Sequence, residues 1–80
     1  MYSIFGGEAE AIELFVSGES SLVGKQIREI KLPQNSLIVA ISRENESIIP
    51  RGDFVIEEND KMVIFTRKED VPAVEKMIQA

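Results

Sequence analysis

Residues that could do chemistry are scarce in this chain of 80 residues, and their scarcity limits the kinds of site it can hold. The sequence contains no His and no Cys, so it lacks the nucleophile and base pairs of the common hydrolases and the ligands that zinc prefers. A small hydrolase would have to use carboxylates such as Glu57 and Asp60 alone, and their expected turn positions offer no pocket to perturb their pKa values. We therefore expect recognition rather than catalysis.

Four carboxylates cluster around one expected turn and could supply oxygen ligands to a hard cation such as calcium. They are Asp53, Glu57, Glu58 and Asp60. Acidic and amide residues in a β-turn also serve turn geometry and solvation, and this second interpretation is the stronger one. We expect no metal site.

One further group of residues indicates a binding site at an end of the expected sheet. A cation beside small apolar walls can bind a flat anionic ligand, with Lys31 supplying the charge and aliphatic side chains contacting a ring. The predicted effector-binding residues are Ile30, Lys31, Leu37, Ile38 and Pro50. The alternative is a sheet end at which Lys31 is merely solvated.

Length and charge exclude other classes. The net charge is −5, and the chain has no basic stripe of the kind that binds nucleic acid. No apolar run approaches the roughly 20 residues of a membrane-spanning helix, and the N-terminus lacks a signal-peptide pattern, which favours a soluble, cytoplasmic domain. Folding at this length hides only roughly 60 % of the chain's surface, so we expect a partner surface, most simply a symmetric homodimer.

The expected elements begin after a short leading segment. Residues 1–8 are typical of a linker, or of the start of a cut piece, because Gly6-Gly7 interrupts a mixed stretch. The remaining residues, 9–80, have the length of one domain. Apolar and acidic residues alternate over 9–16, which predicts a strand.

A short amphipathic helix is expected next. Val23, Ile27 and Ile30 recur at four- and three-residue steps, Gly24 weakens the helix by roughly 1 kcal/mol relative to Ala, and Pro33 ends it. We interpret the apolar stripe as core packing rather than as a groove for a partner.

Three strands then follow in residues 36–65, which read SLIVAISRENESIIPRGDFVIEENDKMVIF. Leu37 to Ile41 is apolar at every position, as in a strand covered by helices on one face and by a partner or ligand on the other. Glu44-Asn45 is the expected hairpin turn, and Asn59 also suits a positive φ.

A terminal helix completes the expected fold, with Val71, Val74 and Ile78 on its inward face. The predicted class is α+β. It has a small mixed sheet in the order strand, helix, three strands, helix, with the helices packed on one face.

Four segments carry a family resemblance: GEAEAIELFV, SSLVGKQIREI, residues 36–65 and DVPAVEKMI. Together they resemble the TrkA C-terminal domain, also called RCK-C, of potassium channel and transporter regulatory subunits. The family usually has Gly where Asn45 and Asn59 stand, and Asn keeps the positive φ available.

The resemblance implies regulation of cation transport. In that family the domain follows a Rossmann-type nucleotide-binding lobe on a cytoplasmic protein, which attaches to a membrane potassium transporter and gates it. It also implies dimerisation through the C-terminal lobes, with an effector bound between them. The alternative is a purely structural oligomerisation domain without an effector.

Some relatives bind cyclic di-AMP at the dimer cleft, so the resemblance implies a nucleotide effector of this kind and no cofactor within the chain. Transferred by position, that site corresponds to the five predicted effector-binding residues. Lys31 stands where those binders more often have Arg, and Leu37 stands where they have Asn. Each change removes hydrogen-bond directionality.

Overall fold

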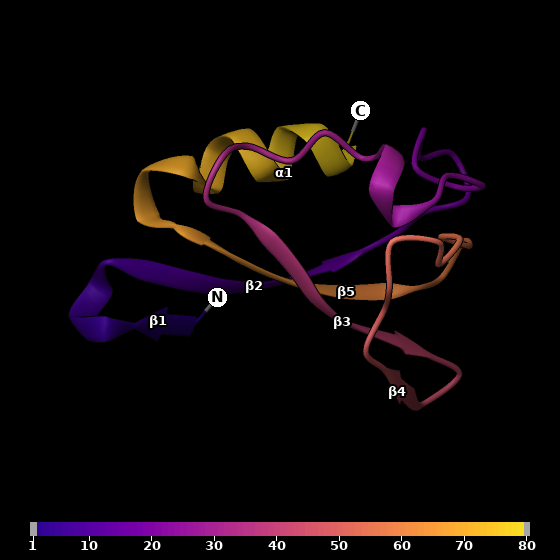
Figure 1. Ribbon diagram of the computed structural model, residues 1–80, viewed down its shortest axis with the longest axis horizontal. Coiled ribbons are helices and arrows are strands. Elements are labelled where there is room, and N and C mark those ends of the chain that lie inside the picture. Colours follow the sequence, from indigo (N-terminus) through magenta and orange to yellow (C-terminus); the bar gives the residue numbers. More distant parts are fainter. Residues whose placement is uncertain (1, 80) are drawn as a thin grey trace.

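The computed structural model describes residues 2–79 and contains one five-stranded sheet with a helix on one side (Figure 1). The strands are β1 (Tyr2–Ile4), β2 (Ala9–Phe15), β3 (Leu37–Arg43), β4 (Glu46–Ile48) and β5 (Lys61–Arg67). The helix is α1 (Val71–Gln79), and the 3-10 turns are η1 (Phe5–Gly7), η2 (Ile27–Glu29) and η3 (Lys68–Asp70). Within residues 2–79, no helix has the length and apolar character to cross a membrane.

The sheet has the order β1-β2-β5-β3-β4, and every neighbouring pair is antiparallel. The predicted α+β class is confirmed, while the sheet is antiparallel rather than mixed in the part of the chain that the structure describes. Because the hydrogen-bonded neighbours β2 and β3 flank β5 on its two sides, β5 is the central strand.

The first strand lies in the segment expected as a linker. Tyr2 pairs with Ala11 of β2, so part of residues 1–8 forms an edge strand of this sheet. The boundary of the domain at residue 9 stays a prediction, and its last residue, Ala80, lies outside the described residues.

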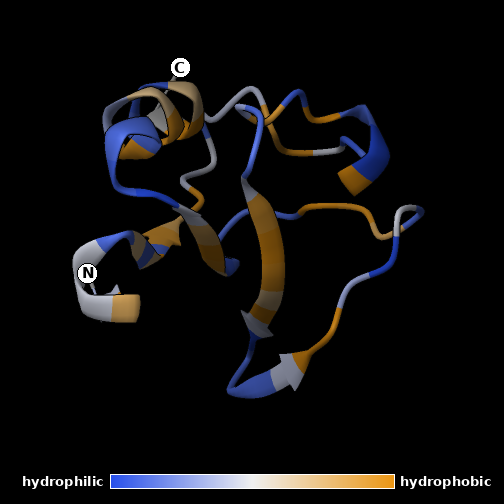
Figure 2. Cartoon of the chain, turned by 60° about the vertical axis from the view of Figure 1, so that its left-hand side comes forward, coloured by the Kyte–Doolittle hydropathy of each residue, from blue (hydrophilic) through white to orange (hydrophobic). Residues whose placement is uncertain are grey.

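Turn chemistry fixes the β3–β4 hairpin. Glu44 has φ 51° and Asn45 has φ 65°, so both central residues occupy the left-handed region that a two-residue hairpin turn requires. Asn59 has φ 71° in the turn before β5. All three positions were expected as turns, and those predictions are confirmed. Figure 2 shows hydrophobic β3 running into this polar hairpin.

The core lies between one face of the sheet and α1. Alternation along β2 and β5 sends every second side chain to this face, and α1 adds its apolar stripe. The predicted inward stripe of Val71, Val74 and Ile78 is confirmed. The buried hydrophobic residues are Ile12, Val16, Leu22, Ile38, Ile41, Ile56, Met62, Ile64, Val71, Val74 and Ile78.

The helix expected to run from Val23 to Ile30 is not formed, and that prediction is wrong. Residues 21–24 form a turn that ends at Gly24 with φ 86°, a conformation that breaks a right-handed helix. Extended pairing replaces the helix, because Gln26 forms an antiparallel bridge with Val55. Only the 3-10 turn η2 keeps a helical geometry.

Candidate functional site

A cavity of about 280 Å³ lies between the segment 21–31 and α1. Its lining combines cationic, hydroxyl and apolar side chains with one carboxylate. The lining residues are Ser21, Leu22, Lys25, Glu29, Ile30, Lys31 and Met77.

The wall of this cavity is tied to α1 at one end. The Ser20 hydroxyl donates to the carbonyl oxygen of Ile78 at 3.4 Å, and its oxygen accepts a hydrogen bond from the Leu22 N–H at 3.1 Å. Leu22 is 3 % exposed and belongs to the core. The turn therefore cannot move away from α1 without losing the Ser20–Ile78 hydrogen bond and the core packing of Leu22.

Backbone pairing with residues 54–56 holds the other side of the wall. The Gly24 N–H donates to the Ile56 carbonyl at 2.8 Å, and the Ile56 N–H donates to the Lys25 carbonyl at 2.9 Å. The Ile27 N–H donates to the Phe54 carbonyl at 2.9 Å. These bonds attach the cavity wall to the loop that precedes β5.

The charges around the cavity are unequal. Lys25 and Lys31 both line it and are exposed, and no salt bridge joins either ammonium group to a carboxylate within residues 2–79. Glu29 is the one acidic lining residue, and its Oε1 accepts a hydrogen bond from the Gln26 N–H at 2.7 Å in a capping box. Two free cations beside an apolar floor suit an anionic ligand.

The structure brings only part of the predicted effector-binding set together. Ile30 and Lys31 line the cavity. Leu37 is 62 % exposed at the start of β3, whereas Ile38 is 5 % exposed and packs in the core. Pro50 follows β4 and is half-buried.

The sequence prediction missed five of the lining residues, which are Ser21, Leu22, Lys25, Glu29 and Met77. Lys25 lies in the segment that was expected as a helix, and nothing in that expectation placed it in one site with Lys31. Met77 comes from α1, more than 40 positions along the chain, and no local pattern joins it to residues 21–31. Only the packing of the turn on α1 creates this juxtaposition.

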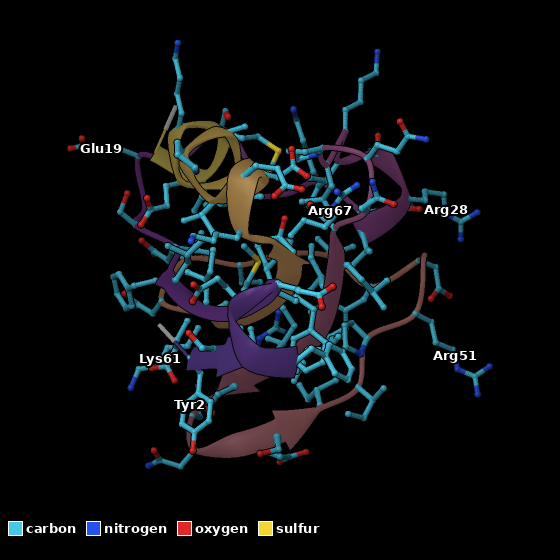
Figure 3. All side chains as sticks on the ribbon, turned by 90° about the vertical axis from the view of Figure 1, so that its left-hand side faces the viewer. Tyr2, Glu19, Arg28, Arg51, Lys61 and Arg67 are labelled. Carbon is cyan, nitrogen blue, oxygen red and sulfur yellow. The ribbon has the colours of Figure 1, made fainter. Side chains whose placement is uncertain are left out.

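A second candidate surface is the sheet face away from α1, which we call the open face. Register places one cross-strand row on it, running from Tyr2 through Ala11 and Phe65 to Leu37. Tyr2 is 76 % exposed, Leu37 62 % and Phe65 43 %. Figure 3 shows Tyr2 and Lys61 on the side of the molecule away from α1.

The open face also carries a hollow. A cavity of about 250 Å³ is lined by Tyr2, Ala11, Ile12, Glu13 and Val63. Glu13 pairs in register with Val63, which places a carboxylate among apolar side chains. An exposed apolar sheet face with a hollow is typical of a surface that contacts another molecule.

The buried ion pair of Arg43 and Asp60 stabilises a loop. Asp60 is fully buried and accepts hydrogen bonds from Arg43 Nε and one terminal nitrogen at 2.8 Å each, and from the Glu57 N–H at 2.9 Å. The Arg43 guanidinium also lies 4.7 Å from the centre of the Phe54 ring. These contacts fix the loop that carries residues 54–56, which pair with the cavity wall.

The pKa of Asp60 reflects two opposing causes. Burial alone raises it, but the hydrogen bonds from Arg43 and the Glu57 N–H, with the charge of Arg43, outweigh burial and leave the pKa below its usual value. Asp60 is thus ionised and fully engaged, which leaves it unsuited to the calcium site considered for this turn. Within residues 2–79, no group of three acidic side chains is placed to hold a metal ion.

Comparison with known proteins gives a consistent result. The profile of the TrkA-C domain family matches residues 12–79. The Trk system potassium uptake protein TrkA homolog 2 of Methanosarcina mazei is 39 % identical over 77 residues, which cover 96 % of this chain and 17 % of that protein. The Trk system potassium uptake protein TrkA of Haemophilus influenzae is 43 % identical over 77 residues, which cover 91 % of this chain and 17 % of that protein.

Solved structures agree with the sequence matches. A structure described as an RCK domain with cda has a TM-score of 0.75 and 25 % identity, covering 85 % of this chain and 96 % of its own. The RCK_C domain dimer of S. agalactiae BusR in complex with c-di-AMP has a TM-score of 0.67 and 35 % identity, covering 85 % and 92 %. The chain spans about a sixth of the length of the two potassium uptake proteins.

Proposed function

Because the chain belongs to the TrkA-C domain family, we propose that it is the regulatory ligand-binding and dimerisation module of a potassium transport system. The domain follows an N-terminal nucleotide-binding lobe and gates a membrane potassium transporter subunit by conformational change. It acts in the cytoplasm, at the membrane only through that transporter. The names of the relatives, which are Trk potassium uptake proteins, support this role.

The observation that carries the proposal is the cavity between residues 21–31 and α1. Lys31 and Ile30 combine there a cation and an apolar wall, as a nucleotide's phosphate and base require. The two solved relatives described above were determined with cda and c-di-AMP, which supports a cyclic dinucleotide as the effector. The other three predicted residues do not line this cavity, so the proposed site keeps Ile30 and Lys31 of the predicted set.

The open face is the surface on which a second copy packs. Its apolar row is too exposed for a domain that works alone, and the dimer described for BusR supports self-association of this chain. An effector that binds one arrangement of the dimer more tightly than another shifts the population toward it. Regulation then needs no bond-making step, only a difference in affinity.

A thermal-shift screen with nucleotides, cyclic dinucleotides and divalent ions tests the effector. A ligand at 100 times its dissociation constant adds about 2.7 kcal/mol to the free energy of unfolding, which raises the melting temperature clearly. We expect cyclic di-AMP to raise it and Lys31→Ala to remove most of the shift. An unchanged melting temperature with every nucleotide would contradict effector binding.

The second candidate is a structural oligomerisation domain without an effector. The exposed row of the open face favours it independently of the cavity. Sedimentation over a range of concentrations distinguishes the two, because both predict dimers but only the regulatory module predicts that a nucleotide changes the association constant. A monomer at all concentrations would contradict both.

A further inference from the structure

Lys25 was not among the residues expected to bind an effector, yet it lines the same cavity as Lys31. We propose that Lys25 is the specificity-determining residue of this cavity, where it binds the phosphate group of an anionic ligand together with Lys31. This inference rests on the proposed effector binding, and it adds a residue and a selection rule to it. The rule is preference for a phosphate-bearing ligand over its uncharged nucleoside.

The backbone of Lys25 is fixed on both sides. Its carbonyl accepts the hydrogen bond from the Ile56 N–H at 2.9 Å, and its N–H donates to the Leu22 carbonyl at 3.0 Å. The preceding residue, Gly24, holds the chain at φ 86°. A side chain on a fixed backbone loses less conformational freedom on binding than one on a flexible loop, so its charge contributes more to affinity.

The charged residues of the cavity wall favour a phosphate-bearing ligand over an uncharged nucleoside. Lys25 and Lys31 are point charges with three donors each, and they are free of salt bridges within residues 2–79. Glu29 opposes them, but its carboxylate is held by the Gln26 N–H at 2.7 Å. The net lining charge is positive by one unit, from two Lys against one Glu. A phosphate gains from both cations, whereas a neutral nucleoside gains only from the apolar surface of Leu22, Ile30 and Met77.

A structural role for Lys25 is the competing explanation. The carbonyl end of α1 lies beside the cavity, where Ser20 donates to the Ile78 carbonyl, and cations near a helix C-terminus stabilise it. In that case removal of Lys25 lowers the melting temperature of the free protein and changes the affinities for charged and uncharged ligands equally. The phosphate-binding role instead lowers affinity for the charged ligand alone.

Calorimetric titration of the 80-residue chain with cyclic di-AMP, adenosine and inorganic phosphate tests the proposal. We expect Lys25→Ala to weaken cyclic di-AMP binding about tenfold or more, as the loss of a charge-assisted hydrogen bond does, while adenosine binding and the free melting temperature stay unchanged. Lys25→Arg should restore most of the affinity. Glu29→Gln keeps an acceptor for Gln26 and should strengthen cyclic di-AMP binding severalfold.

Lys68→Ala is the matched control, because Lys68 is an exposed cation in η3, outside the lining of this cavity. Raised salt should weaken wild-type binding more than binding by Lys25→Ala, since one charge has been removed. Wild-type affinity in Lys25→Ala, with loss in Lys31→Ala, would overturn this inference and leave the proposed function standing. A wild-type chain that binds no nucleotide would overturn both, and equal weakening of adenosine and cyclic di-AMP would assign Lys25 a structural role.

Discussion

Ile64 and Phe65 are neighbours on the central strand, and they report on two very different faces of the same sheet. Ile64 is fully buried beneath α1, whereas Phe65 is 43 % exposed on the open face. Both residues are large and apolar, so composition does not distinguish them. What differs is that the chain itself covers one face and leaves the other uncovered (Figure 1).

This difference indicates which apolar residues the fold requires. An antiparallel sheet with one covered face normally carries polar residues on its second face. Here the open face carries Tyr2, Phe15, Leu37 and Phe65 beside its polar residues, each of the four at least 43 % exposed. Large apolar residues that the chain leaves this exposed on one sheet face are best explained by contacts with another molecule.

The largest effect should come from the covered face. Ile64→Ala leaves a cavity in the core and should lower the free energy of unfolding by about 3 kcal/mol, within the range for buried aliphatic residues. Phe65→Ala, one position away, should cost less than about 1 kcal/mol in the monomer. Urea unfolding at a concentration too low for self-association measures both, and equal losses would remove the distinction between the faces.

Removal of the buried carboxylate Asp60 should destabilise the protein almost as much, because its hydrogen-bonding partners would be left without an acceptor. Asp60→Ala removes the acceptor for Arg43 and for the Glu57 N–H, and should cost about 3 kcal/mol in urea unfolding. Asp53→Ala, an exposed carboxylate in the same loop, should stay within about 0.5 kcal/mol of the wild type. A much smaller loss of unfolding free energy in Asp60→Ala would mean that water replaces these hydrogen bonds.

A substitution on the open face should weaken self-association and leave the stability of the monomer nearly unchanged. Phe65→Glu should weaken self-association at least about tenfold, because it places a charge in the centre of an apolar interface. Stability of the monomer should change little. Sedimentation measures the association constant, and Lys61→Glu tests whether any added negative charge has the same effect at the rim. Unchanged association in Phe65→Glu would place the partner surface elsewhere on the molecule.

Low pH should destabilise the protein in the same way as Asp60→Ala, but less, because it protonates the Asp60 carboxylate. The folded pKa of Asp60 lies below its unfolded value, so its contribution is complete above the unfolded pKa of about 4 and is lost as the pH falls through the folded pKa. Urea midpoints from pH 7 down to pH 2 measure this loss. Asp60→Asn should be less stable at pH 7 and flatter across the acid range, and parallel curves would assign the acid sensitivity to other carboxylates.

Sequence reasoning succeeded where a local rule decides the structure. Alternation identified β2, the positive-φ tolerance of Asn identified the turns at Asn45 and Asn59, and helical spacing identified α1 with Val74 at its centre. Each of these depends on residues near one another in the chain. The apolar run at the start of β3 also indicated a strand with two apolar faces.

It failed where residues distant in sequence decide. Helical spacing at Val23 and Ile27 suggested a helix, but pairing with residues 54–56 satisfies the backbone in an extended form instead. Because that segment is a turn, Lys25 lies in the cavity wall beside Met77 of α1. Leu37 and Ile38 lie on opposite faces of β3, as neighbours on a strand do, so one ligand on either face cannot contact both. The candidate site therefore could not be assembled from local patterns.

The smallest expected effect is the change in unfolding free energy caused by Gly24→Ala, and its sign distinguishes a helix from a turn over residues 21–30. If the segment were a helix, Gly24→Ala would stabilise the protein by roughly 1 kcal/mol, because Ala is the better helix former. Gly24 instead has φ 86°, with no atom within 4 Å of a Cβ placed there, so the substitution should cost about 1 kcal/mol in backbone strain alone. Gly52→Ala is the control, because that residue does not have a left-handed φ and a Cβ would meet Arg28 at an ordinary 3.6 Å. Urea unfolding of the two variants should thus show a loss at Gly24 and little change at Gly52. Because Gly24 also positions Lys25, the same variant should bind cyclic di-AMP more weakly, which a stabilised helix would not predict.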